Sequence, residues 1–335
     1  MDSLKRLRLI NSIICDQSIE IRSTLIVDYE TPLDLKNFKH LNITYYSNLK
    51  NKIDQAKIAG ISFSTKTKNE YDLVIVSAQK SREETLHKIA MGYQHTKMGG
   101  AFIIEGGRRN GIDSIIKNVS DIIPIDYITS KGHGKIALLK LRSKNSKTFS
   151  NWSQLGNPVR NLDGFFSVPG LFSYKRVDPA SQFLSETFDK KITGNVIDLG
   201  CGWGFLSSEA LTKCEEITSI KLIDNDSKAI RSAKLNIENP KATFEWMDIS
   251  ETLLTNKKFD TVICNPPFHY GSTKDIKLGL SFIDVSSHIL KDSGKMLIVA
   301  NVHLPYENII NKLFSKFNII KQNKCYKIIL ASQPK

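Results

Sequence analysis

The motif Asn265-Pro266-Pro267-Phe268 is the strongest candidate for chemistry in the sequence. It follows an apolar stretch, 259–264, that predicts a β-strand. Two prolines end the strand and stiffen the loop, because proline fixes φ and lacks a backbone donor. The side-chain oxygen of Asn265 and the carbonyl of Pro266 can then accept both hydrogens of a planar NH2 group. The pattern predicts a site that positions an amino nitrogen for attack on an electrophilic methyl.

The aromatic residue of this motif and the histidine after it have separate expected roles. Phe268 would stack on the planar group that carries the NH2. His269 is able to relay a proton, but we favour a role in orienting the loop or contacting the substrate. The alternative for the whole motif is a proline-rich turn without chemistry.

A glycine-rich loop is the second candidate site. It runs from Gly200 to Gly204, follows a predicted strand over 195–199 and precedes helical spacing over 205–211. The strict dinucleotide fingerprint is missing, which favours S-adenosylmethionine, with its ammonium and sulfonium, as the ligand. The alternative is an ordinary strand-to-helix turn. The expected cofactor-binding residues in and before this loop are Asp198, Gly200, Cys201, Gly202 and Gly204.

Two acids follow the next predicted strands. Asp224 ends the strand 220–224 and lies 24 positions after Gly200, a spacing that suits an acid at ribose hydroxyls. Asp248 follows the strand 243–247, where its carboxylate can accept a hydrogen bond from an adenine amino group. The alternative for Asp248 is the N-cap of the next helix.

The elements around these motifs alternate between strands and helices. The remaining expected elements of the second half are helices at 227–237, 276–290 and 306–317 and strands at 294–300 and 326–330. This order predicts an α/β fold with a doubly wound sheet of six or seven strands.

The first half resembles a degenerate copy of the second. Residues 71–79 align with 259–267, 100–104 with 294–298 and 135–139 with 327–331, and helical stretches at 82–97 and 111–120 lie between them. Ser77-Ala78-Gln79 replaces Asn-Pro-Pro, and no comparable glycine motif precedes it. We therefore predict two tandem doubly wound, Rossmann-like domains, 1–145 and 155–335, the first degenerate. Chance similarity of βα units is the alternative. The polar stretch 143–154 is the expected linker.

Positive charge is concentrated in the first half. Residues 1–150 hold 24 basic and 15 acidic side chains, against 23 and 19 in 151–335. Such an excess favours a polyanion such as RNA, with Arg108 and Arg109 as candidate phosphate contacts. Biased composition is the alternative explanation, since Lys outnumbers Arg 37 to 10. For the two arginines, the alternative is a solvated loop cluster.

Composition argues against several other classes of protein. We find no apolar run long enough to span a membrane and no signal-peptide pattern at the start. The five cysteines form no C-x-x-C pair, which argues against both a disulfide framework and a metal site. We expect a reduced, cytoplasmic protein.

The two main motifs together resemble class I S-adenosylmethionine-dependent methyltransferases that act on planar NH2 groups. The sequence is most similar to ribosomal RNA guanine-N2 methyltransferases of the RsmC and RlmG type. Three further stretches are similar to segments of that family: 165–167 (Phe-Phe-Ser), 178–182 (Asp-Pro-Ala-Ser-Gln) and 299–306. The similarity is strong over about 160–331 and weak before it.

The resemblance implies methyl transfer to the N2 amino group of a guanine, most simply in small-subunit ribosomal RNA. It implies ribosomal RNA or a ribosomal subunit particle as partner, and we expect a monomer. The segment 168–177 is longer than in the family, so base choice stays open, with Tyr174 and Arg176 as candidates to hold a flipped base. The rival substrates are a protein glutamine and an adenine, although Phe268 and the duplicated domain favour guanine. The rival class is a non-catalytic RNA-binding or assembly protein.

Overall fold

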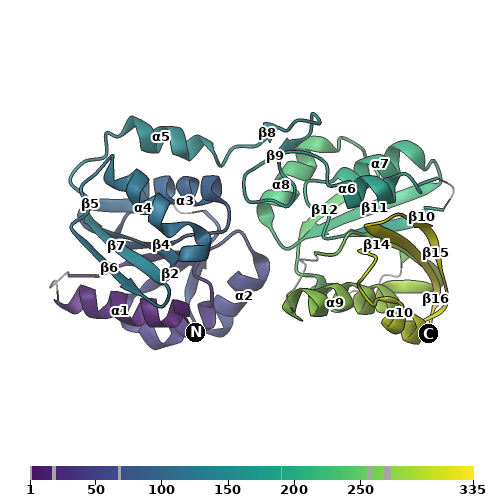
Figure 1. Ribbon diagram of the computed structural model, residues 1–335, viewed down its shortest axis with the longest axis horizontal. Helices are drawn as coiled ribbons and strands as arrows, with labels where there is room; N and C mark the ends of the chain where they lie inside the picture. The colour runs from purple at the N-terminus through teal and green to yellow at the C-terminus, as the bar shows by residue number, and fades with distance from the viewer. Residues whose placement is uncertain (1, 17–19, 67–68, 190, 255–258, 268–272) are drawn as a thin grey trace. The chain divides into compact units, whose positions relative to one another are not determined.

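The computed structural model describes residues 2–16, 20–66, 69–189, 191–254, 259–267 and 273–335. The chain forms two compact units. The N-terminal unit comprises Met1–Pro158 and Val168–Gly170, and the C-terminal unit comprises Val159–Ser167 and Leu171–Lys335. Each unit contains one seven-stranded sheet (Figure 1). The prediction of two tandem α/β domains is confirmed.

The sheet of the C-terminal unit has the strand order β12-β11-β10-β13-β14-β16-β15. All neighbouring strands are parallel except in the last two pairs, β14–β16 and β15–β16. The strands are β10 (Gly194–Leu199), β11 (Ile217–Asp224), β12 (Ala242–Trp246), β13 (Phe259–Cys264), β14 (Leu290–Asn301), β15 (Phe314–Gln322) and β16 (Tyr326–Pro334). The helices are α6 (Pro179–Ser185), α7 (Phe205–Lys213), α8 (Ser227–Asn236), α9 (Thr273–Ile289) and α10 (Glu307–Leu313).

Helices cover both faces of this sheet, α6, α7 and α8 on one and α9 and α10 on the other (Figure 1). Successive strand residues point to opposite faces. Ile298 of β14 therefore belongs to the same core cluster as Phe282 of α9, whereas Val299 belongs to the cluster that contains Leu184 of α6. A sheet buried on both faces explains why its central strands are almost continuously apolar.

The sheet of the N-terminal unit repeats the same order, β3-β2-β1-β4-β5-β7-β6. The pairing of Ile104 with Ala137 corresponds to that of Ile298 with Ile329, as the alignment of the two halves predicts. The strands are β1 (Thr24–Val27), β2 (Ile43–Tyr46), β3 (Ser62–Ser64), β4 (Tyr71–Ser77), β5 (Thr96–Gly107), β6 (Tyr127–Lys131) and β7 (Gly134–Lys140). The helices are α1 (Asp2–Asp16), α2 (Lys50–Ile58), α3 (Arg82–His95), α4 (Ile112–Ser120) and α5 (Lys147–Gln154), with 3-10 helices η1 (Pro32–Leu41) and η2 (Arg108–Asn110).

The prediction of an irregular linker at 143–154 is wrong, because most of this segment forms α5. The Ser146 side chain caps the helix by accepting a hydrogen bond from the backbone N–H of Phe149. Phe149 is fully buried, and its ring stacks on Tyr93 of α3 at 4.2 Å between centroids. This segment therefore packs as part of the N-terminal unit, and the division between the units falls after Pro158.

The expected helix over 306–317 is also partly wrong. Helix α10 ends at Leu313, and Phe314 begins β15, which pairs antiparallel with β16. Phe314 is buried in the core beneath α9 and α10. Pairing with β16 thus overrides the helical spacing of the local sequence.

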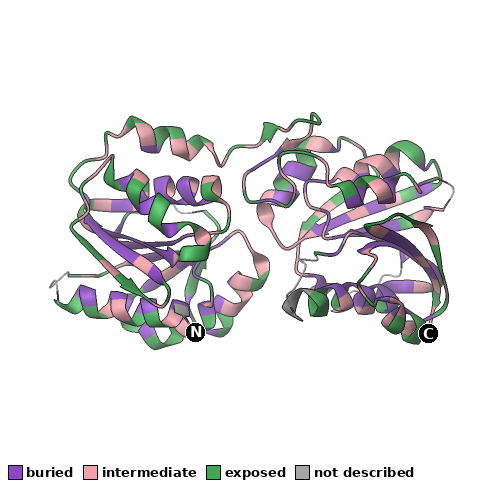
Figure 2. Ribbon diagram, viewed as in Figure 1, coloured by how far each residue is buried: buried purple, intermediate pink, exposed green. Residues whose placement is uncertain are grey.

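Buried residues follow the strands in each unit, while exposed residues lie on the outer faces of the helices (Figure 2). Among the residues that the structure describes, no helix has the length and apolar character needed to cross a membrane.

Candidate active site

The glycine loop joins β10 to α7 in a conformation that requires glycine at both of its ends. Gly200 has φ 71°, and its N–H donates to the Ile223 carbonyl at 3.0 Å. Gly204 has φ 92°, and a Cβ there would lie 3.0 Å from Ile237. A Cβ on Gly202 would meet nothing within 4 Å. The loop therefore packs against its own unit at Gly204 and is open at Gly202, where a ligand can approach the backbone.

Cys201 lies within this loop as a buried packing residue. Its N–H donates to the Ile223 carbonyl at 2.9 Å, and burial raises the pKa of its thiol well above the usual value. Cys264, at the end of β13, is also buried with a raised pKa. Neither thiol has the depressed pKa of a reactive nucleophile.

Asp198 is fully buried at the end of β10. Its Oδ2 accepts a hydrogen bond from Ser207 Oγ at 2.6 Å, and its Oδ1 is buried with no hydrogen-bond partner among the described residues. Burial raises the pKa of Asp198 to about 7. A partnerless buried carboxylate oxygen beside a glycine loop is suited to a cationic ligand, such as the ammonium group of S-adenosylmethionine.

Asp224 ends β11 beside the same loop. Its two oxygens accept the backbone N–H groups of Gly202 and Asp226, each at 2.8 Å. Burial raises the pKa of Asp224 to about 6. The carboxylate oxygens have further lone pairs that can accept hydrogen bonds from ribose hydroxyl groups.

Asp248 follows β12, and its contacts are those of an N-cap. Its Oδ1 accepts Ser250 N–H at 3.0 Å, while its own N–H donates to Glu251 Oε1 at 3.0 Å. This is the capping arrangement that the sequence left open as an alternative. Because β10, β11 and β12 are parallel neighbours, Asp198, Asp224 and Asp248 follow one another along a single edge of the sheet.

Asn265 follows β13, the neighbour of β10 on the other side. Its Nδ2 donates to Asp178 Oδ2 at 2.9 Å and to Ser181 Oγ at 2.8 Å. Its Oδ1 is buried and has no hydrogen-bond partner among the described residues. Pro266 is buried and Pro267 is exposed, whereas Phe268 and His269 lie outside the described residues.

Asn236, at the end of α8, joins the glycine loop to a short hairpin, β8 (Val159–Arg160) and β9 (Phe166–Ser167). Its Nδ2 donates to the carbonyls of Phe166 and Trp203, both at 2.8 Å, and its Oδ1 accepts Phe166 N–H at 2.6 Å. The rings of Phe165 and Trp203 lie 5.0 Å apart. No local sequence pattern indicates a role for Asn236, because its partners are 33 and 70 positions away.

Tyr174 and Arg176 lie in the segment that leads directly to Asp178. Two hydrogen bonds join this segment to the loop between β8 and β9. Leu162 N–H donates to the Lys175 carbonyl at 3.0 Å, and Val177 N–H donates to Asp163 Oδ2 at 2.6 Å. Tyr174 is half-buried and Arg176 is exposed. The chain therefore places both residues within four positions of a side chain that contacts Asn265.

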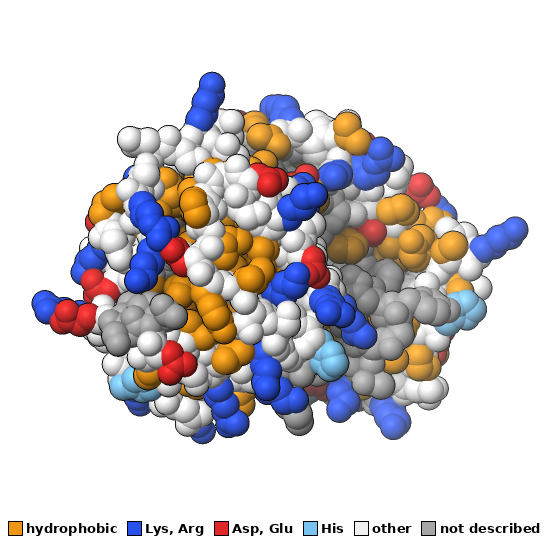
Figure 3. Space-filling model, turned by 60° about the vertical axis from the view of Figure 1, so that its left-hand side comes forward, with side chains coloured by type: hydrophobic (Ala, Val, Ile, Leu, Met, Phe, Trp, Pro, Cys, Tyr) orange, Lys and Arg blue, Asp and Glu red, His pale blue; other side chains and the backbone are white. Residues whose placement is uncertain are grey.

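Arg108 and Arg109 are exposed in η2, directly after β5. Asn110 of η2 donates to the Ala78 carbonyl at 2.7 Å, which ties η2 to the loop after β4, where Lys80 is exposed. These basic residues thus share one edge of the N-terminal sheet. On the face drawn in Figure 3, Lys and Arg side chains are spread across the surface rather than gathered in one patch.

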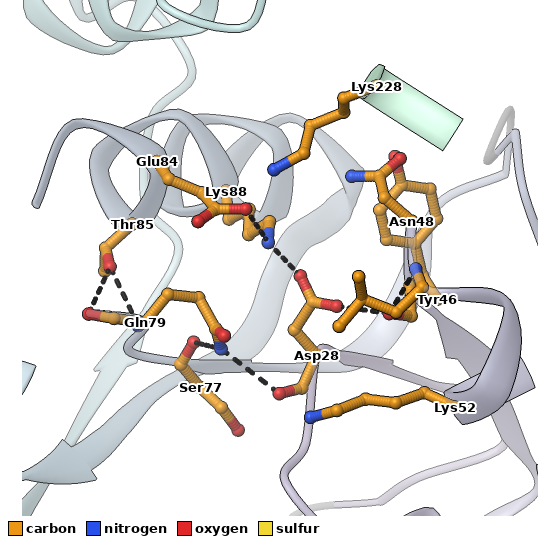
Figure 4. A network of polar contacts seen from close by, with 12 residues as sticks. Asp28, Tyr46, Asn48, Lys52, Ser77, Gln79, Glu84, Thr85, Lys88 and Lys228 are labelled. Atoms are coloured by element: carbon orange, nitrogen blue, oxygen red, sulfur yellow. Dashed lines mark hydrogen bonds and ion pairs between the residues drawn. The ribbon is translucent and has the colours of Figure 1, made fainter. Parts of the chain in front are cut away.

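In the N-terminal unit, side chains fill the place that corresponds to the cofactor site. Asp28 follows β1 with φ 52° and donates its N–H to the Tyr46 carbonyl, as Gly200 does to Ile223. The buried Asp28 carboxylate pairs with Lys88 of α3, which also pairs with Glu84 at 2.7 Å (Figure 4). Lys88 precedes β5 by the same eight positions as Phe282 precedes β14. An ion pair therefore stands where the C-terminal unit has a glycine and a phenylalanine.

This buried pair is stable as an ion pair. Burial alone would raise the pKa of Asp28, but the Lys88 charge and hydrogen bonds lower it overall. The charges of Asp28 and Glu84 raise the pKa of Lys88 in spite of its burial. The N-terminal copy is thus degenerate in structure as well as in sequence.

In the C-terminal unit, the glycine loop follows the central strand β10. Asp224 ends β11, Asp248 follows β12, and the Asn-Pro-Pro loop follows β13 on the other side of β10. A doubly wound sheet with this arrangement defines a class I S-adenosylmethionine-dependent methyltransferase. Comparison with known families and proteins agrees. The family model "Methyltransferase small domain" matches residues 164–330, and "Methyltransferase small domain N-terminal" matches 25–154.

The chain also resembles individual curated proteins over most of its length. It is 30% identical over 315 residues to "Ribosomal RNA small subunit methyltransferase C" of Psychromonas ingrahamii, covering 90% of this chain and 89% of that protein. A relative of the same name from Haemophilus influenzae is 27% identical and covers 81% and 82%.

Among solved structures, the T. thermophilus 16S rRNA N2 G1207 methyltransferase (RsmC), in complex with AdoMet and guanosine, has the same two-domain fold. Its TM-score is 0.75 at 20% identity, covering 93% of this chain and 88% of that one. The chain belongs to the methyltransferase small domain family and is an S-adenosylmethionine-dependent methyltransferase. The resemblance inferred from its motifs is confirmed.

Proposed function

We propose that the chain methylates the exocyclic N2 amino group of a guanine in small-subunit ribosomal RNA. The observation that carries this proposal is Oδ1 of Asn265, which is buried without a hydrogen-bond partner among the described residues, at the edge of the sheet that holds the cofactor site. An acceptor in that position suits an amino group. The relatives named as ribosomal RNA small subunit methyltransferases, and the structure of similar fold in complex with AdoMet and guanosine, favour guanine in ribosomal RNA.

The cofactor would lie along the edge formed by β10, β11 and β12. Asp198, Gly200 and Gly202 would hold its methionine end, Asp224 its ribose and Asp248 its adenine. Cys201 and Gly204 would contribute by shaping the loop that faces the cofactor. When bound, S-adenosylmethionine supplies an electrophilic methyl group on its sulfonium. The open side of Gly202 fits such a ligand, and so does Oδ1 of Asp198, for which the described part of the chain offers no hydrogen-bond partner.

The Asn-Pro-Pro loop would position the amino group. Asn265 Oδ1 and the Pro266 carbonyl accept its two hydrogens, so that the nitrogen lone pair is directed at the methyl group. Phe268 would stack on the base, and Tyr174, Arg176 and His269 would contact the flipped nucleotide. Because the main contribution is alignment, the reaction does not depend on a strong base in the site.

Substitution of Asn265 tests this role. Asn265→Ala should abolish methyl transfer from tritiated S-adenosylmethionine to ribosomal RNA of a strain that lacks the gene, and leave cofactor affinity by calorimetry within a few fold. Asn195→Ala is the matched control, because Asn195 is exposed at the opposite end of β10. Wild-type turnover by Asn265→Ala would refute the assigned role.

Analysis of the methylated product separates the rival substrates. Nuclease digestion and mass spectrometry should give N2-methylguanosine. N6-methyladenosine, or methylation of a protein glutamine instead of RNA, would reassign the substrate. A calorimetric titration in which S-adenosylmethionine produced no heat would favour the non-catalytic RNA-binding class.

The N-terminal unit is proposed to hold the RNA or to support the catalytic unit. Arg108 and Arg109 would contact phosphates. The partner would be ribosomal RNA or a ribosomal subunit particle, bound by a monomer of this chain.

A further inference from the structure

We propose that Asp178 and Ser181 are positioning residues that determine which atom of the Asn265 amide faces the substrate. The proposal rests on the proposed function, because it concerns the same amino-group site. It gives a role to the contacts between the Asn-Pro-Pro loop and a segment more than 80 positions earlier in the chain.

The contacts of the Asn265 side chain fix the orientation of its amide. Both hydrogens of Nδ2 are used, one by Asp178 Oδ2 at 2.9 Å and one by Ser181 Oγ at 2.8 Å. An ionised carboxylate can only accept hydrogen bonds. If the amide rotated by half a turn, its Oδ1 would face the Asp178 carboxylate, so that two acceptors would meet and Asp178 would lose the donor Nδ2. Asp178 therefore keeps Oδ1 of Asn265 on the side away from itself.

Asp178 and Ser181 are themselves held firmly. The same Oδ2 of Asp178 accepts Ser181 N–H at 2.9 Å and so caps α6, and Pro179 occupies the first turn of the helix. Ala180 and Leu184 of α6 are fully buried in the core that covers one face of the sheet. The acceptors for Asn265 thus belong to a packed helix terminus rather than to a mobile loop.

The chemical consequence concerns the direction of the hydrogen bonds. A substrate NH2 group has hydrogens to donate, so it needs an oxygen from Asn265 and is repelled by an NH2. An amide free to turn would present the wrong atom for part of the time. Fixing the rotamer is expected to raise the rate of transfer more than it raises substrate affinity, because alignment matters most in the transition state.

The variant Asp178→Asn tests the proposal with little change in shape. Loss of a hydrogen bond to a charged group predicts a fall in kcat of about 10- to 100-fold, with the KM for RNA and the Kd for S-adenosylmethionine within a few fold. Ser181→Ala, which keeps the backbone cap of α6, should lower kcat by a smaller factor. Asp260→Asn is the matched control, since Asp260 lies at the other end of β13 and pairs with Lys291. That control should change melting temperature without changing kcat.

The decisive experiment exchanges the two groups. In Asn265→Asp alone, two carboxyl groups face each other, and activity should be low. In the double variant Asp178→Asn with Asn265→Asp, the new amide donates to the new carboxylate, whose other oxygen still faces the substrate. This double variant should have a higher kcat than either single variant, a rescue that a purely structural role of Asp178 would not produce.

The outcomes distinguish this proposal from the proposed function. Wild-type kcat in both Asp178→Asn and Ser181→Ala would overturn the positioning role, as would a double variant no faster than Asp178→Asn. If Asn265→Ala itself kept wild-type turnover, the proposed function of the loop would fail instead. Melting temperatures of all variants, compared with that of Asp260→Asn, show whether a loss of kcat merely reflects unfolding.

Discussion

At the scale of single residues, the site contains buried acids whose pKa values lie close to neutral pH. Asp198 and Asp224 have pKa values raised to about 7 and about 6, in each case mainly by burial. Burial penalises the charged form, and a bound cation would favour it. Near neutral pH the two carboxyl groups are therefore partly protonated in the free site. Because a cationic ligand binds their ionised form, binding of the cofactor depends on pH.

The affinity for S-adenosylmethionine should fall as the pH is lowered from 8 to 6. At pH 6 an acid of pKa about 7 is only about one-tenth ionised, so we expect a loss of up to about tenfold. Calorimetric Kd values at pH 6, 7 and 8 would measure it. Asp198→Asn should weaken binding at pH 8 and flatten the profile, whereas a flat profile in the wild type would contradict the assignment of Asp198.

At the scale of elements, the hairpin β8–β9 and the glycine loop form one assembly through Asn236. One amide satisfies three backbone groups, from Phe166 and Trp203. The rings of Phe165, Trp203 and Phe205 pack on one another. The shape of the loop at Gly202 thus depends on a segment that the glycine motif itself does not contain.

Asn236→Ala should destabilise the C-terminal unit by about 1–3 kcal/mol, because it leaves three partly buried backbone groups without the partner that the amide supplies. Cofactor affinity should fall as well, and the hairpin at 159–167 should be cleaved faster by protease. Denaturant unfolding, calorimetry and limited proteolysis would measure the three effects, with the exposed Asn195→Ala as control. Unchanged cofactor affinity in a destabilised variant would show that the hairpin does not shape the loop.

At the scale of the whole molecule, one fold is used twice with different side chains at the same edge. Asp28 and Lys88 occupy this edge in the N-terminal copy. In the C-terminal copy it is lined by glycines and by an Asp198 oxygen that has no hydrogen-bond partner within the described ranges. A desolvated ion pair is costly to disrupt, since removal of one partner leaves a buried charge. The N-terminal unit is therefore closed to the cofactor by its own side chains.

A titration with S-adenosylmethionine should give one site per chain. The physical reason is that the ligand would have to displace the buried pair of Asp28 and Lys88. Calorimetry on the full chain measures the stoichiometry, and Gly202→Trp, which would fill the open side of the C-terminal loop, should abolish binding altogether. Two sites, or binding that survives Gly202→Trp, would contradict closure of the N-terminal copy.

The charge of the N-terminal unit leads to a prediction about RNA. Arg108→Glu with Arg109→Glu should weaken binding of ribosomal RNA and reduce its salt dependence, since each lost phosphate contact lowers the slope. Filter binding at several salt concentrations would measure both, with Lys57→Glu, an exposed residue on α2, as a single charge-reversal control. If the affinity for RNA and its salt dependence did not change, these arginines would be a solvated cluster without contact to phosphates.

The sequence alone determined the fold class, the duplication, nearly all strands around the site and the residues that define the two motifs. These features are local: an apolar strand, a glycine turn and a pair of prolines each specify backbone geometry within a few residues. The alternation of strands and helices then allows few topologies other than the doubly wound one.

Only the tertiary structure decided the features that depend on distant partners. Phe314 leaves a helical pattern to pair with β16, and residues 147–154 form a helix because Phe149 packs on Tyr93. The partners of Asn236 and Asn265 lie between 33 and 87 positions away, so no local pattern reveals them. Hydrogen bonds and packing across such separations exist only after the sheet has formed, and they set the orientation of the side chains that the motifs supply.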